Sequence, residues 1–152
     1  IFNPIELIIM NASSIVSNFY IANKIASTAV LFRKYFPEAK VSFSPWDNSK
    51  DNNLCDSIDF YFYFPGWNPN LECRAILLQL SIENNSENQD PKLLGIIMKG
   101  TLLPQERWMV ATVGKWEMTG THLPQKAQKD NLFLVCKELY KLFSTTSIGN
   151  KK

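Results

Sequence analysis

The chain contains a single histidine, His122, and this sets narrow limits on its chemistry. A serine or cysteine nucleophile would need His122 as its base, but no nucleophile motif surrounds any serine or cysteine. Neither a P-loop nor a GxGxxG pattern occurs, so no phosphate cradle for a nucleotide is recognisable. We therefore expect no catalytic residue, no metal and no cofactor. His122 is interpreted as a loop histidine, although it could act alone as an acid or base.

Polar and aromatic side chains alternate with apolar ones between Ile58 and Phe64. In a strand, Asp59, Tyr61 and Tyr63 would share the face opposite the phenylalanines. These three residues could line a ligand pocket in the sheet, and the candidate ligand-binding residues are Asp59, Tyr61, Tyr63, Arg74 and His122. Packing beneath the terminal helices is the simpler interpretation of the same face, and a protein-binding surface is a third.

A tryptophan stands in the predicted turn Gly66-Trp67-Asn68-Pro69. An exposed indole has few structural reasons to lie in a turn, and tryptophan is enriched at the energetic centres of protein interfaces. We therefore take Trp46, Trp67 and Asn68 as candidate partner-binding residues. The alternative is that Trp67 folds back onto the edge of the sheet.

The composition is that of an ordinary folded protein, with 152 residues, 45% apolar residues and 20% charged residues. A chain of this length can build one hydrophobic core, so we expect a single domain over residues 1–143 and a flexible tail over residues 144–152. No uninterrupted apolar run approaches the roughly 20 residues of a membrane span, and we expect none.

Charge is distributed unevenly along the chain. Residues 37–92 contain four basic and nine acidic residues, whereas residues 93–152 contain nine basic and four acidic residues. Such asymmetry influences the choice of partner more than the fold. Several of the basic residues fall on the last predicted helix, at Lys126, Lys129, Lys137 and Lys141. We interpret them as a solvated helix face in preference to a nucleic-acid interface.

Hydrophobic periodicity predicts helices at both ends of the chain and strands between them. A helix, or two helices divided at Ser13 and Ser14, runs from about Asn3 and ends before Pro37, and another helix begins near Gln125. Five segments have the period of a strand, at Val41–Trp46, Ile58–Phe64, Arg74–Glu83, Leu93–Leu103 and Trp108–Thr119. Their short connections favour an antiparallel meander. The strand residues expected to face the core include Phe60, Phe62, Leu78, Leu94, Ile96, Val110 and Trp116, and the last helix is expected to bury an apolar stripe from Leu132 to Phe143. The predicted class is α+β, and the element order resembles cystatin-like and nuclear-transport-factor-like folds, in which a curved sheet wraps a helix.

Scaffolds of this kind host binders, assembly factors and enzymes alike, so the fold does not select a function. The leading hypothesis is a non-catalytic binding or assembly-factor protein whose partner is another protein. The alternative is a small-molecule binder or small enzyme with a sheet cavity lined by Asp59, Tyr61 and Tyr63, whose ligand would be hydrophobic or aromatic. The sequence gives little support to nucleic-acid binding.

The three cysteines, Cys55, Cys73 and Cys136, form no close pair and no CxxC motif. We expect free thiols, and hence a location in the cytoplasm or another reducing compartment. Mass measurement of the intact protein without reductant should show no loss of two hydrogens relative to the reduced chain. A disulfide between any two of these cysteines would contradict both expectations.

Overall fold

A computed structural model describes residues 12–42, 55–83 and 92–144, and the structural statements below refer to these residues. Helix α2 (Ala12–Tyr35) is followed by strands β1 (Lys40–Ser42), β2 (Cys55–Asn68), β3 (Cys73–Glu83), β4 (Lys92–Leu102), β5 (Gln105–Ala111) and β6 (Glu117–Gly120), and helix α3 (Lys126–Ser144) follows the last strand. The predicted helix start at Asn3, residue Trp46 and nearly all of the predicted tail lie outside the described residues.

Helix α2 ends where the sequence predicts, just before Pro37. The N–H of Phe36 closes the last turn on the carbonyl of Phe32 at 3.0 Å, and Pro37 has no N–H with which to continue the helix. Arg33 lies in the last turn, where a cation is favourable, and its Nε donates to the carbonyl of Ala39 at 2.8 Å. This bond fixes the connection from α2 to β1.

The six strands form one antiparallel sheet in the order β1-β2-β3-β4-β5-β6, which confirms the predicted α+β class and the meander. The count is one higher than predicted, because the segment Trp108–Thr119 is divided between β5 and β6. Gly114, between these strands, has a φ of 82°, a left-handed conformation that glycine adopts without steric cost. Trp116 continues the apolar alternation but packs on α3, with ring centroids 5.6 Å from Tyr140.

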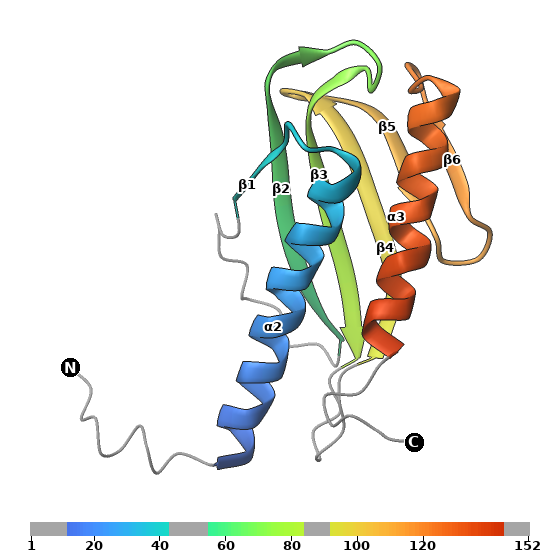
Figure 1. Cartoon of the computed structure of the whole chain (residues 1–152). Coiled ribbons are helices and arrows are strands. Elements are labelled where there is room, and N and C mark those ends of the chain that lie inside the picture. The colour runs from blue at the N-terminus through green and yellow to red at the C-terminus, as the bar shows by residue number, and fades with distance from the viewer. Residues whose placement is uncertain (1–11, 43–54, 84–91, 145–152) are drawn as a thin grey trace.

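Both helices cover the same face of the sheet (Figure 1). Alternate residues of the strands point toward them, so Phe60, Phe62, Leu78, Ile96 and Val110 are buried, as predicted. Helix α2 contributes Phe32, whose ring stacks on Phe62 with centroids 3.8 Å apart. The stripe predicted on the last helix is also buried, at Leu132, Val135, Cys136, Leu139 and Phe143.

One predicted core position in β4 is wrong. Leu94 is 41% exposed, and Leu93 is buried in its place. The pairing of β3 with β4 shifts between Ser81 and Ile82, so one extra residue of β4 reverses the alternation at this point.

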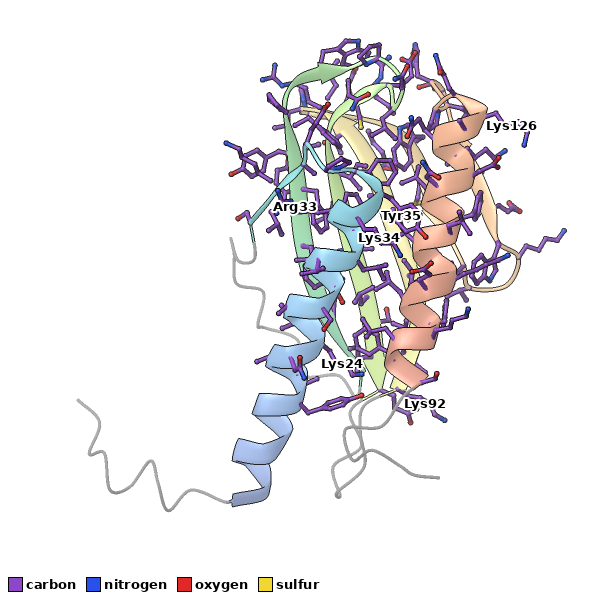
Figure 2. All side chains as sticks on the ribbon, in the orientation of Figure 1. Lys24, Arg33, Lys34, Tyr35, Lys92 and Lys126 are labelled. Carbon is purple, nitrogen blue, oxygen red and sulfur yellow. The ribbon has the colours of Figure 1, made fainter. Side chains whose placement is uncertain are left out.

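Polar contacts hold the two helices together (Figure 2). The ammonium group of Lys24 on α2 donates to the carbonyl of Leu142 in the last turn of α3 at 2.8 Å. A cation at this end of a helix is favourable, because the helix dipole is negative there. The hydroxyl of Tyr35 donates to Glu138 of α3 at 2.7 Å, and this hydrogen bond is the main cause of the raised pKa of Tyr35.

The largest fully buried side chain, Trp108 of β5, lies against Gly100 of β4, its partner in the sheet. A Cβ atom at Gly100 would overlap the indole ring. The strand therefore requires glycine here for packing, because only the absence of a side chain makes room for the tryptophan.

We expect Gly100→Ala to lower the free energy of unfolding by about 1–3 kcal/mol, the usual cost of overpacking a core. Gly66→Ala is the matched control, because nothing lies within 4 Å of the position of its Cβ. Urea unfolding of both variants checks this. Equal stability of Gly100→Ala and the wild-type chain would contradict the packing described for Trp108.

Candidate functional site

A cleft of about 480 Å³ lies where three segments distant in the sequence meet. These are the connection after α2, the end of β2 with the turn that follows it, and the first turns of α3, at the upper end of the view in Figure 1. The residues that line the cleft include Tyr35 and the half-exposed Trp67, together with Phe36 and Phe64, which are almost fully buried. The volume is within the range of ligand pockets in general.

The turn between β2 and β3 owes its shape to Asn68. Its side-chain oxygen accepts hydrogen bonds from the N–H groups of Asn70 and Leu71, both at 3.1 Å. This arrangement mimics a backbone turn and is characteristic of asparagine. The carbonyl of Asn70 accepts from the N–H of Gln125 at 3.0 Å, so the turn is also joined to the segment that leads into α3.

Two neighbouring residues of β5 donate hydrogen bonds to the carbonyls of the last two residues of the turn, Leu71 and Glu72. The indole N–H of buried Trp108 donates to the carbonyl of Leu71 at 2.7 Å. Arg107 donates to Glu72 twice, from Nε to the main-chain carbonyl at 2.9 Å and from its terminal nitrogen to the carboxylate at 2.8 Å. Glu72 has a φ of 56°, an uncommon conformation for a residue other than glycine, and these bonds hold it there.

Trp67 is 44% exposed and has a fixed neighbour. The guanidinium of Arg107 lies over its ring, 5.0 Å from the centroid. This distance is within the range of a cation–π interaction. Trp67 lines the cleft and Arg107 does not, so the arginine supports the indole from outside the cleft. The predicted partner-binding residues Trp67 and Asn68 thus belong to one cleft, whereas Trp46 lies outside the described residues.

The polar groups of the cleft differ in whether they already have partners. Within the described residues, the indole N–H of Trp67 and the side-chain amides of Asn70 and Gln128 make no hydrogen bond, and Glu38 makes no ion pair. In contrast, the hydroxyl of Tyr35 is bound to Glu138. The cleft therefore presents several unused hydrogen-bonding groups beside exposed aromatic surface.

The predicted ligand-binding residues of β2 lie on the sheet face opposite the helices. Asp59 accepts hydrogen bonds from Ser57 at 2.8 Å and from Gln79 at 3.5 Å. The rings of Tyr61 and Tyr63 are neighbours, with centroids 6.3 Å apart. This face is not packed beneath the helices, because the helices cover the face formed by the phenylalanines.

Arg74 and His122 are not joined to these three residues. Arg74 is exposed at the start of β3. His122 is exposed after β6, where its ring nitrogen Nδ1 lies 2.9 Å from the hydroxyl of Thr121. Within the described residues, no hydrogen bond or ion pair links either residue to Asp59, Tyr61 or Tyr63.

Burial makes two of the cysteines unreactive. Cys73 and Cys136 are free and buried, and loss of solvation raises the pKa of each to about 12. Both thiols are therefore protonated at neutral pH and are poor nucleophiles. The side chain of Cys55 lies outside the described residues.

The chain belongs to a protein family whose shared region is a domain of unknown function, and the match covers residues 13–145. No curated protein and no solved structure shows significant similarity to the chain. In the described part of the chain, neither helix has the length and hydrophobicity required to cross a bilayer.

Arg107→Ala should lower the free energy of unfolding by about 2 kcal/mol, because it removes a charge-assisted pair and leaves the carbonyl of Glu72 without its donor. Lys126→Ala is the control. This variant breaks the ion pair between Lys126 and Asp130, whose side chains are 83% and 58% exposed. Exposed pairs of this kind contribute less than about 1 kcal/mol to the free energy of unfolding. Chemical unfolding compares the two variants. Equal losses would show that Arg107 does not hold the turn.

Proposed function

We propose that the chain is a non-catalytic protein-binding module that holds its partner at the cleft beside Trp67. The observation that carries this proposal is a half-exposed tryptophan that lines a cleft and is supported by a fixed arginine. Tryptophan side chains in such positions account for much of the binding energy in protein interfaces. A partner therefore gains apolar contact from Trp67 and excludes water from its ring.

Tight binding is favoured because Arg107 already holds the Trp67 ring in place. Arg107 lies against the indole and is itself fixed by two hydrogen bonds to Glu72. Ordering a side chain on binding costs about 0.5–1.5 kcal/mol, and a ring that is already held avoids part of that cost. The prolines of the cleft, Pro37, Pro65 and Pro69, restrict the main chain around it in the same way.

A small-molecule or enzymatic role centred on Asp59, Tyr61 and Tyr63 remains the alternative proposal. It would operate on the sheet face that neither helix covers, because the other face is filled with apolar side chains. A single sheet face excludes less water from a small ligand than a cleft does, so its polar contacts would contribute less. The position of Trp67 therefore supports the protein-binding proposal more directly.

Two tryptophans of similar exposure allow a controlled test. Trp67 is 44% exposed in the cleft, and Trp116 is 40% exposed over α3. We expect Trp67→Ala to reduce capture of the natural partner from the protein's own cell extract at least tenfold, which corresponds to about 1.4 kcal/mol. The free energy of unfolding should fall by less than about 1 kcal/mol, because an exposed cation–π contact contributes no more than that.

Quantitative mass spectrometry of the captured proteins gives the readout, and Trp116→Ala should capture the same partner as the wild-type chain. Unchanged capture by Trp67→Ala would contradict the proposal. So would an equal loss in both variants, because the effect would then not be specific to the cleft.

A further inference from the structure

The apolar part of the cleft is formed by flat and rigid rings. Trp67 and Tyr35 provide aromatic surface, and Pro37, Pro65 and Pro69 provide three pyrrolidine rings whose main-chain φ angles are fixed. Aromatic grooves of this kind accept the ridges of a polyproline II helix, because proline rings pack flat against aromatic faces. A polyproline II segment is also extended before it binds, so it loses little conformational entropy.

The hydrogen-bonding groups of the cleft point to the same ligand chemistry. The indole N–H of Trp67 can only donate, and it has no acceptor within the described residues. Asn70 and Gln128 add side-chain amides that are also unpaired within these residues. A polyproline II segment has no internal hydrogen bonds, so its carbonyls are free acceptors, and its prolines bring no N–H donors.

The charge of the cleft indicates which residues should stand next to the proline-rich segment of the ligand. Among the described residues that line the cleft, Glu38 is the one with a charged side chain, and it forms no ion pair with any of the described residues. An arginine or lysine next to the proline-rich segment would complement this carboxylate. An acidic flank would be repelled.

We infer that the cleft binds an extended proline-rich segment of a partner protein, with an arginine or lysine beside it. This inference rests on the proposed function and adds the chemistry of the partner. The proline rings pack between Trp67 and Tyr35, a carbonyl accepts from the indole N–H of Trp67, and the basic side chain pairs with Glu38.

A synthetic peptide of about ten residues, rich in proline and with an arginine at each end, tests the inference by NMR titration of the full chain; in the polyproline II form it spans roughly 30 Å. The indole N–H signal of Trp67 should shift, whereas the signals of Trp108 and Trp116 should not. Replacing the prolines of the peptide by alanine should weaken binding at least tenfold. A peptide that binds equally well without prolines would not be recognised through its proline rings, and the inference would be wrong.

Two conservative variants test the indole hydrogen bond and the Glu38 ion pair one at a time, without disturbing the core. Trp67→Phe keeps an aromatic ring but removes the indole donor, and we expect severalfold weaker peptide binding. Glu38→Gln should weaken binding of the arginine peptide but leave unchanged the binding of the same peptide with glutamine in place of arginine. Absence of these differences would overturn the assigned contacts.

Failure of this inference is distinguishable from failure of the proposed function. If the peptide does not bind but Trp67→Ala still loses capture of the natural partner, the cleft binds a different kind of segment, and only the inference is overturned. If capture does not depend on Trp67, both are overturned.

Discussion

The hydrogen bonds from Arg107 and Trp108 to the turn between β2 and β3 are the constraint on which the candidate site depends. The two residues are adjacent on β5, yet one side chain is buried in the core and the other reaches the surface. Trp108 thereby fixes the turn to the core at Leu71, while Arg107 fixes Glu72 and supports the ring of Trp67. Two adjacent residues of β5 thus position the exposed tryptophan at the end of the sheet.

Placement of both helices on one face of the sheet divides the molecule into two unlike surfaces (Figure 1). The covered face holds the core, and the other carries the tyrosines and Asp59 of β2. The cleft belongs to neither surface, because it forms at the end of the layers where a helix end, a strand turn and a helix start converge. Such connecting segments tolerate sequence change, so this is a place where binding can arise without cost to the core.

Hydrophobic periodicity correctly predicted which side of a single strand or helix is buried. The alternation from Ile58 to Phe64 and the stripe from Leu132 to Phe143 each record which side faces the core, and both proved correct. The β5–β6 turn was missed because Trp116 continues the apolar alternation through it. The cleft could be predicted only at Trp67 and Asn68, since its other walls come from residues as distant as Tyr35 and Gln128. Nor does any local pattern indicate that Arg107 reaches Glu72, because that contact joins positions 35 residues apart.

Oxidative footprinting of the intact chain tests most directly the claim that a partner covers the cleft. Hydroxyl radicals oxidise exposed indoles, and the chain provides its own reference in Trp116, whose exposure is close to that of Trp67. The ratio of oxidation at Trp67 to that at Trp116 would be compared between the purified chain and the chain in its own cell extract. We expect this ratio to fall in the extract. An unchanged ratio, with the partner present and bound, would contradict the claim that a partner covers the cleft.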